Sequence, residues 1–316
     1  MRSLTKTKTS NQPSFGKRLG GKWLIHLFPL PALAIYLLFI VYPIVTAFVY
    51  SLFDWDGLRR GAYIGLQNFV HLFTKKPFSD MFWRALEHNA YYFILEMIVQ
   101  NGLAFLLAYI LFTKIRGKGF FKIAFFVPRL LSVIVVGFLW KLILNPNTGM
   151  FNQMLKTIGL GSWAKPWLGD TNTALTAIIL INSWFGIGFA MLIFLAGLQS
   201  IPAELIEAAR LEGAKGFRLV RSIILPLIIP SITIITVFTF MQAFQAFELV
   251  YAMQGSDGSP FYSTDTLAVY FYRLAFGGAN ATEIGLGSAL AVVLFVIIAM
   301  VTAIYLYWTR KKAVAL

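Results

Sequence analysis

The sequence predicts an all-α membrane protein with six transmembrane helices and both termini in the cytoplasm. Its composition points this way, because 58% of the 316 residues are hydrophobic and only 13% are charged, against about a quarter charged in a typical soluble domain. Apolar stretches of about 20 residues, the length that a helix needs to cross the hydrocarbon core, recur along the chain. Basic residues gather in alternate connections between these stretches, as the positive-inside rule requires.

Charge-free runs mark four of the six spans. They lie between Lys22 and Asp54, between Asp170 and Glu204, between Arg221 and Glu248, and between Glu283 and Arg310. Two further stretches, residues 91–112 and 123–144, are also apolar but carry charge within them. We expect a transmembrane domain over residues 24–312, with spans at about 30–53, 89–112, 120–144, 172–198, 223–250 and 284–308.

The distribution of Lys and Arg sets the orientation of the chain. Seventeen of these residues fall in the segments that share a side with the termini, and nine fall in the three opposite connections. The basic tail of residues 1–23 and the C-terminal end of residues 313–316 are therefore expected in the cytoplasm, the tail as a disordered segment. The formal charge of +14 then reflects topology rather than binding of nucleic acid.

Several kinds of site are not expected in this chain. No cysteine is present, and His26, His71 and His88 make no ligand pair at helical spacing, so no metal site is expected. The stretch GKRLGGKW, residues 16–23, has the glycine spacing and the lysine of a phosphate-binding loop, but Trp23 stands where Ser or Thr is required. No pair of nucleophile and base marks a catalytic site. We therefore expect no enzyme activity, no catalytic residue and no cofactor.

The fourth connection between spans contains a short charged helix on the cytoplasmic side. Ser200 can cap this helix, and Pro202 fits its first turn. Two acids, Glu204 and Glu207, suit the positive end of the helix dipole. Gly213 provides a stop, because glycine tolerates the left-handed conformation that ends helices. Such a helix is either an ordinary solvated connection or a rigid knob that docks on another protein.

The same connection resembles the EAA loop of the permease subunits of bacterial ABC importers. Their pattern is Glu-Ala-Ala, then an acidic residue with Gly and Ala, and later Ile-x-Leu-Pro, and the stretch EAARLEGAKGFRLVRSIILP matches it. The matching positions are Glu207, Ala208, Ala209, Glu212, Gly213, Ala214, Ile223, Leu225 and Pro226. Glu212 stands where the family more often has Asp. Longer stretches, among them FFKIAFFVPRLLSVIVVGFLWKLILNPNTGMFN and TDTLAVYFYRLAF, resemble the maltose-type and multiple-sugar permeases of the carbohydrate-uptake group.

The resemblance implies the ABC importer type I permease fold and ATP-driven import of a carbohydrate, an oligosaccharide in particular, across the bacterial cytoplasmic membrane. It also implies three partners: a second homologous permease in a heterodimer, an ABC ATPase dimer that holds ATP and Mg, and an extracytoplasmic substrate-binding protein. The coupling loop of residues 199–222 would insert its helix into a cleft on the ATPase. The residues assigned to coupling are Glu204, Glu207, Ala208, Ala209, Glu212, Gly213, Ala214, Leu225 and Pro226.

Polar groups at membrane depth are the candidates for the substrate pathway, because they are costly there unless they face protein or water. The candidates are Asn182, Trp184 and Gly186 in the fourth span and Thr239, Gln242, Gln245 and Glu248 in the fifth. The last three are spaced three residues apart, which keeps them on one slowly rotating helix face. Amides and hydroxyls beside aromatic rings suit a sugar, and the alternative is hydrogen bonding between helices. These two spans supply no cation for a glycerol phosphate.

A second polar face lies in the second span, where Glu96 is followed by Gln100 and Asn101. An ion pair between Glu96 and Arg129 is one arrangement of these charges. A self-sufficient secondary carrier that uses Glu96, Arg129 and Glu248 is therefore the alternative function. That alternative leaves the EAA loop unexplained.

Overall fold

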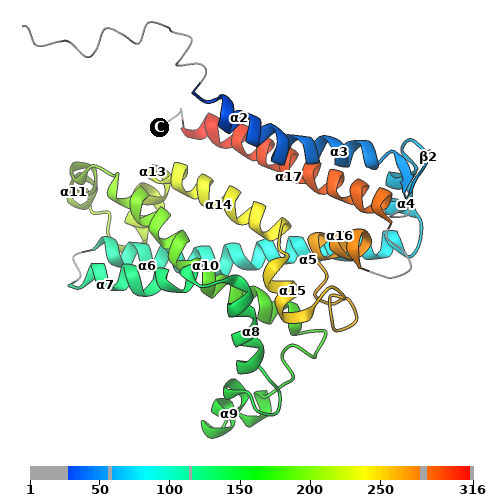
Figure 1. Cartoon of the computed structure of the whole chain (residues 1–316). Helices are drawn as coiled ribbons and strands as arrows, with labels where there is room; N and C mark the ends of the chain where they lie inside the picture. Colours follow the sequence, from blue (N-terminus) through cyan, green and yellow to red (C-terminus); the bar gives the residue numbers. More distant parts are fainter. Residues whose placement is uncertain (1–27, 56–58, 114–115, 278–282, 314–316) are drawn as a thin grey trace, which may run out of the picture. The chain divides into compact units, whose positions relative to one another are not determined.

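The computed structural model describes residues 28–55, 59–113, 116–277 and 283–313, which form two compact units, residues 1–47 and 48–316 (Figure 1). The predicted cytoplasmic tail and the phosphate-loop look-alike lie outside the described residues. The helix α2 (Leu30–Tyr36), the π-helical turn η1 (Leu37–Val41) and α3 (Tyr42–Tyr50) join into one apolar helix of 21 residues, of which the part up to Ala47 belongs to the first unit. That helix ends at Tyr50, because the chain turns there toward a strand.

The second unit begins with a small hairpin and a short amphipathic helix. Strand β1 (Phe53–Trp55) pairs antiparallel with β2 (Arg60–Tyr63), and α4 (Gln67–Thr74) follows. Leu72 of α4 is fully buried, where α4 packs against α5 and α17. The Asn68 side chain donates hydrogen bonds to the carbonyl oxygens of Ser51 and Phe53 at 2.9 Å each, which ties α4 to the hairpin.

Two long helices form the frame of this unit. Helix α5 (Phe78–Glu96), the π-helical turn η2 (Met97–Asn101) and α6 (Gly102–Phe112) make one helix of 35 residues. Helix α10 (Ala174–Gln199) packs against α5, α6, α7 and α14. A Cβ at Gly188 of α10 would lie 2.1 Å from the carbonyl oxygen of Phe125, so this glycine allows α7 to approach closely.

The third apolar stretch is two helices rather than the single helix that we expected. Helix α7 (Lys118–Phe126) and the 3-10 turn η3 (Val127–Leu130) are followed by α8 (Val133–Ile143), with a bend of 94° between the two halves. Pro128 lies in η3, and Ser132 is extended at the start of α8. Pro128 lies where the α-helix tightens into the 3-10 turn, since proline removes one backbone hydrogen bond, and the bend follows at Leu131 and Ser132, whose backbones are extended. The outer connection then forms α9 (Met150–Thr157) and η4 (Gly161–Trp163).

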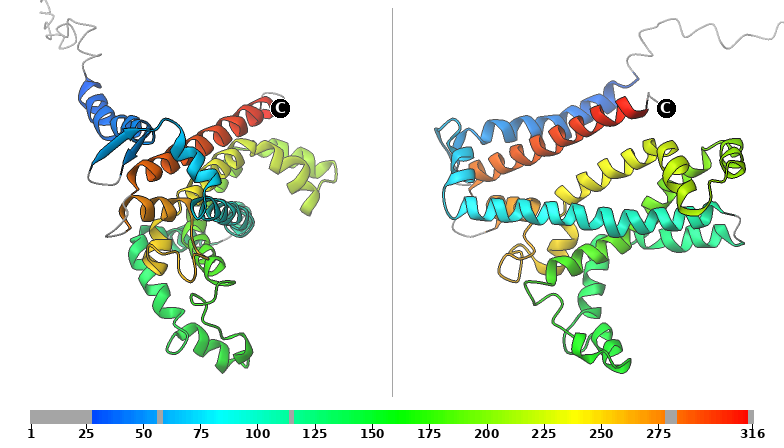
Figure 2. Two further views of the ribbon diagram at one scale, coloured as in Figure 1. Left: turned by 90° about the vertical axis from the view of Figure 1, so that its right-hand side faces the viewer. Right: turned by 180° about the vertical axis from the view of Figure 1, so that it is seen from behind.

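The C-terminal half contains the connection that resembles the EAA loop and the last two spans. Helices α11 (Ala203–Leu211), α12 (Gly216–Leu219), η5 (Val220–Ile224) and α13 (Leu225–Leu227) lead into α14 (Ile229–Phe244). The fifth span breaks at residues 245–247 before α15 (Glu248–Gln254). Helix α16 (Leu267–Phe276) and the last span, α17 (Ile284–Ala313), follow. Within this unit α11 and α16 lie at opposite ends of the bundle (Figures 1 and 2).

Among the described residues, five helices are long and apolar enough to cross a membrane, and the bent pair α7 and α8 brings the number to six. This agrees with the predicted all-α membrane fold. Two hydrophobic clusters hold the second unit together: one includes Phe82, Tyr92, Ile178, Met253 and Tyr270, and the other includes Ala108, Met191, Leu198, Ile206 and Ala209. The second cluster is the one that fixes α11 to the spans.

Candidate functional site

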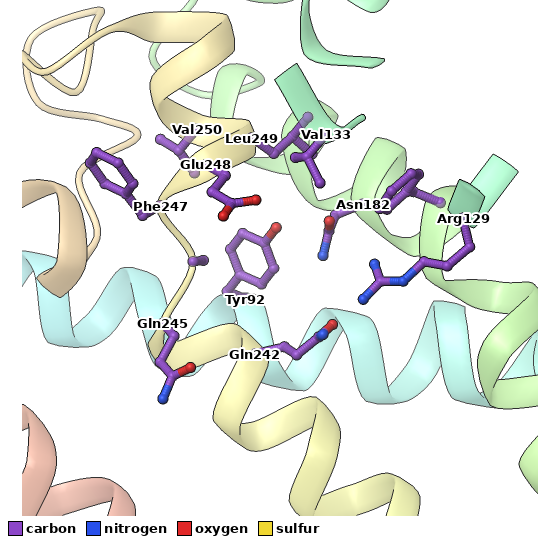
Figure 3. Close-up of a pocket in the computed structure, with 12 residues that line it drawn as sticks. Tyr92, Arg129, Val133, Asn182, Gln242, Gln245, Phe247, Glu248, Leu249 and Val250 are labelled. Carbon is purple, nitrogen blue, oxygen red and sulfur yellow. The ribbon is translucent and has the colours of Figure 1, made fainter. Parts of the chain in front are cut away.

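A cavity of about 320 Å³ lies among the spans of the second unit (Figure 3). Its lining comes from α5, the bend between α7 and α8, α10, and the break between α14 and α15. The lining residues are Tyr92, Arg129, Val133, Asn182, Phe185, Gln242, Gln245, Ala246, Phe247, Glu248, Leu249 and Val250. Both interruptions of regular helix therefore contribute to the cavity wall, and they place charged and amide side chains there.

Asn182 is oriented by a carboxylate behind the cavity. Its Nδ2 donates a hydrogen bond of 2.6 Å to Oε1 of Glu96, whose side chain is only 1% exposed. The Asn182 side chain points into the cavity toward Tyr92 (Figure 3). Because the amide nitrogen is directed at Glu96, the amide carbonyl oxygen is the group that can accept a hydrogen bond from a bound molecule.

Arg129 reaches the cavity from the bend in the third stretch. Its guanidinium carbon lies over the Phe185 ring, 4.8 Å from the ring centre, which is a cation–π contact. The ion pair of Glu96 with Arg129 considered from the sequence is not formed. The ion pairs within the described ranges are Lys76 with Asp80 and Asp265 with Arg273.

The structure places four of the seven predicted pathway residues in the cavity wall, namely Asn182, Gln242, Gln245 and Glu248. The argument for the last three was a continuous helix face, and that argument was wrong, because the helix breaks at residues 245–247. Their place in the wall depends on the break itself. The break turns the chain so that the Glu248 side chain points into the cavity, toward Tyr92 and Asn182 (Figure 3).

The other three predicted pathway residues lie outside the cavity wall: Gly186 and Thr239 are buried between helices, and Trp184 is 42% exposed. The Trp184 ring lies 5.6 Å from that of Trp140, edge to face. A Cβ at Gly186 would lie 2.2 Å from Oε1 of Gln100, so Gly186 gives room for that side chain. Thr239 is 1% exposed, and its Oγ1 accepts a hydrogen bond of 3.0 Å from Nδ2 of Asn101. These contacts fit the alternative of hydrogen bonding and close packing between spans.

Sequence reasoning missed two aromatic residues of the wall, Tyr92 and Phe185. Each is about one helical turn from a polar residue that it did identify, since Tyr92 precedes Glu96 by four residues and Phe185 follows Asn182 by three. Residues three and four apart share a helix face. Extending the two polar faces by one turn would have found both. From the sequence, Arg129 was considered as an ion-pair partner of Glu96 and in the alternative secondary carrier, but not among the residues of the sugar pathway.

Helix α11 ends in a Schellman motif. Gly213 has φ of +87°, the N–H of Gly213 donates to the carbonyl of Arg210 at 3.1 Å, and the N–H of Ala214 donates to the carbonyl of Ala209 at 2.9 Å. These two hydrogen bonds satisfy carbonyls that a helix end otherwise leaves free. The prediction for Ser200 was wrong: its hydroxyl donates to the carbonyl of Gly197 and so ends α10, while Pro202 occupies the N-cap of α11.

The predicted coupling residues divide between an outer and an inner face. Glu204, Glu207, Ala208, Glu212 and Gly213 are exposed. Ala209 is buried in the cluster that fixes α11 to the spans, and Ala214 packs against that cluster. Leu225 and Pro226 are half-buried in α13, and Leu225 packs against the same cluster. Two apolar side chains add to the outer surface, because Leu211 is 90% and Phe217 74% exposed.

Comparison with known proteins assigns the chain to a family. Residues 100–313 match the family model described as the binding-protein-dependent transport system inner membrane component. The chain belongs to this family. It is therefore a multi-pass inner-membrane permease, as the EAA motif predicted.

Relatives of this permease match along nearly its whole length. The probable starch degradation products transport system permease protein of Thermoanaerobacterium thermosulfurigenes is 30% identical over 288 residues, which is 91% of this chain and 94% of that protein. The trehalose/maltose transport system permease protein of Thermococcus litoralis is 30% identical, over 89% of this chain and 92% of that protein. A chain of a bacterial ABC transporter that imports alginate has a TM-score of 0.76 and 25% identity, with 92% and 96% of the two chains covered.

Proposed function

We propose that this permease carries a carbohydrate, an oligosaccharide in particular, across the cytoplasmic membrane as part of an ATP-driven importer. The observation that carries the proposal is the composition of the central cavity wall. Amide groups of Asn182 and Gln242, the carboxylate of Glu248 and the guanidinium of Arg129 share this wall with the rings of Tyr92 and Phe185. The Phe247 ring packs instead against Tyr251 and Tyr272. A sugar offers hydroxyls to the polar groups of the wall and C–H faces to the Tyr92 and Phe185 rings.

The relatives support a carbohydrate as the cargo. The names of three of them refer to starch degradation products, to trehalose and maltose, and to multiple sugars. The structural neighbour imports alginate, an acidic polysaccharide. Each name describes that relative, and the sugar of this permease is part of the proposal.

A glycerol phosphate is the second candidate, and one observation favours it. The fourth and fifth spans supply no cation, but the bend in the third stretch brings Arg129 into the wall. A guanidinium binds phosphate or carboxylate well. Another relative, a permease protein of the sn-glycerol-3-phosphate transport system of Agrobacterium fabrum, is 30% identical over 92% of this chain. Glu248 in the same wall repels an anion, which places the neutral sugar first.

We propose further that α11 couples the permease to a separate ATPase subunit, the chain that holds ATP and Mg. The outer face of α11 presents acids next to exposed Leu211 and Phe217, and its inner face is packed on the spans. A short helix fixed at both its end and its inner face moves as one body with the spans, which suits transmission of a rigid-body motion. Contact with a cytoplasmic ATPase requires that the coupling loop and both termini lie in the cytoplasm.

The remaining partners follow from the same proposal. A second homologous permease completes the translocation path, and a substrate-binding protein delivers the sugar from outside. One solved relative, with a TM-score of 0.77 and 25% identity, is an alginate transporter in complex with a pentasaccharide-bound periplasmic protein. A secondary carrier is disfavoured, because Glu96 is bonded to Asn182 behind the wall rather than to Arg129.

The first experiment is purification of the tagged permease from its native membrane, with mass spectrometry of the proteins that accompany it. We expect a second six-span permease and an ATPase, both retained with wild type and the ATPase lost with Glu207→Lys. Uptake of a neutral oligosaccharide panel and of glycerol 3-phosphate into liposomes then assigns the cargo. A permease that purifies alone and still transports solute would refute the coupling role of α11.

A further inference from the structure

The break between α14 and α15 leaves backbone carbonyls that a continuous helix would use. Residues 245–247 lie inside the candidate span Ile229–Gln254. In a continuous helix the carbonyl of Ala243 would accept from the N–H of Phe247, and that of Ala246 from the N–H of Val250. Backbone groups at membrane depth need partners, because no bulk water is available. The partners here are side chains from other elements.

Two buried side chains bind these carbonyls. Nδ2 of Asn89 in α5 donates to the carbonyl oxygen of Ala243 at 2.6 Å. Oγ1 of Thr266 donates to the carbonyl oxygen of Ala246 at 2.6 Å. Both Asn89 and Thr266 are 0% exposed. We call this pair the break clamp.

The break clamp also joins the start of α16. Oδ1 of Asn89 accepts a hydrogen bond of 2.8 Å from the N–H of Leu267. Oγ1 of Thr266 accepts one of 3.2 Å from the N–H of Val269, so Thr266 is the N-cap of α16. Each side chain thus serves two elements at once. Helices α5 and α16 are thereby fixed to the same short segment of backbone.

The residue before Thr266 holds the clamp in place. The Nδ1–H of His88 donates to the Asp265 carbonyl at 2.7 Å, and the Asp265 carboxylate pairs with the guanidinium of Arg273. Burial lowers the pKa of Arg273, but the hydrogen bond and charge of Asp265 outweigh it and raise that pKa overall. Arg273 also donates to the Ser256 carbonyl at 3.2 Å. Arg273 thus binds both Ser256 and Asp265, near the two ends of the loop that precedes α16.

We propose that Asn89 and Thr266 are positioning residues for the substrate cavity. By occupying the Ala243 and Ala246 carbonyls, they keep the helix open at residues 245–247, so that the Glu248 side chain faces the cavity (Figure 3). This rests on the proposed function, since it assigns the break clamp to the cargo site. Without the clamp, the N–H of Phe247 can bond to Ala243 and extend α14, which redirects the wall residues.

The test uses the complete transporter with its partners and compares matched variants. Thr266→Val keeps the shape of the side chain and removes both hydrogen bonds, and Thr266→Ser restores them. Thr264→Val is the control, because Thr264 is also 0% exposed but its hydroxyl donates to the Ser259 carbonyl inside the loop. Asn89→Asp provides an independent variant that removes the donor to Ala243 and keeps the acceptor for Leu267.

Hydrogen–deuterium exchange of residues 243–250 measures the protection of the backbone N–H groups in this part of the cavity wall, and it requires no assumption about the cargo. We expect at least a fivefold change in exchange rate in this segment for Thr266→Val and Asn89→Asp, and wild-type exchange for Thr266→Ser and Thr264→Val, because one hydrogen bond corresponds to about a tenfold change in an equilibrium constant. Wild-type exchange in both Thr266→Val and Asn89→Asp would overturn the proposal. If Thr266→Val does not assemble, Asn89→Asp decides the question.

Uptake measurements separate positioning from general stability. For a saccharide that wild type transports, we expect the KM of Thr266→Val to rise about tenfold with restoration by Thr266→Ser, while the ATPase remains bound. A fall in maximal rate with unchanged KM would contradict the positioning role. If wild type transports no saccharide but the exchange changes as expected, the carbohydrate assignment fails, whereas the hold of the break clamp on the cavity wall stands.

Discussion

Gly213→Pro is expected to uncouple transport from the ATPase while the permease still inserts into the membrane. Gly213 ends α11 with φ of +87°, and its N–H donates to the carbonyl of Arg210. Proline fixes φ near −65° and has no N–H, so it removes both the turn and the hydrogen bond. The next residue, Ala214, would then lose its register with the Ala209 carbonyl. The outer face of α11 depends on this helix end for its orientation.

The size of the effect can be worked out from the geometry at Gly213. An added Cβ would meet nothing within 4 Å, so Gly213→Ala introduces only backbone strain. The left-handed conformation costs an L-residue about 1–2 kcal/mol, which corresponds to roughly a 5- to 30-fold loss of the native helix end. Proline costs about 3 kcal/mol or more, or above about a hundredfold. The association of the ATPase should weaken in that order, by up to these factors.

The assay measures binding of the ATPase to detergent-purified permease complex, together with ATP-dependent uptake in liposomes. Gly102→Ala is a suitable control, because a Cβ there also meets nothing within 4 Å and the residue has helical φ and ψ where η2 continues into α6. We expect both ATPase binding and ATP-dependent uptake to decrease in the order control, Gly213→Ala, Gly213→Pro. Normal uptake by Gly213→Pro, with the protein correctly inserted, would refute the assignment of α11 as the coupling element.

Three further substitutions test the cavity and the packing of the spans. Glu96→Leu removes the partner of the Asn182 amide and is expected to weaken cargo affinity about tenfold, since an unpaired buried polar group costs roughly 1–3 kcal/mol. Glu96→Gln keeps an acceptor and should restore most of the affinity. Equal uptake kinetics in the two variants would contradict the role of Glu96 in orienting Asn182. Gly188→Ala forces a methyl group to within 2.1 Å of a backbone carbonyl of α7 and should lower stability by about 1–3 kcal/mol, measured by thermal unfolding against Gly102→Ala. Glu248→Leu should change the KM for sugar without release of the ATPase, and loss of the ATPase would instead show a structural role.

The sequence was most informative where the physical cause is local. Long apolar runs require spanning helices whatever surrounds them, and the end of α11 follows from one glycine with its neighbours in sequence. Pro128 was visible inside the third stretch, and it lies in the 3-10 turn that directly precedes the 94° bend. Ser200 shows the limit of such reasoning, because its hydroxyl has two possible helices to serve and bonds to the preceding one. Local pattern could not decide between them.

The cavity was harder to predict because its geometry depends on distant residues. The break at residues 245–247 contains Gln, Ala and Phe, with neither proline nor glycine to interrupt the helix. Sharp breaks without those residues arise where a side chain inserts into the hydrogen-bond ladder. Here one inserted side chain, Asn89, is 154 residues from Ala243 in sequence. Polar residues near Gln245 could be assigned to a pathway from composition alone, but the wall that they form is fixed by partners that only the folded chain brings to them.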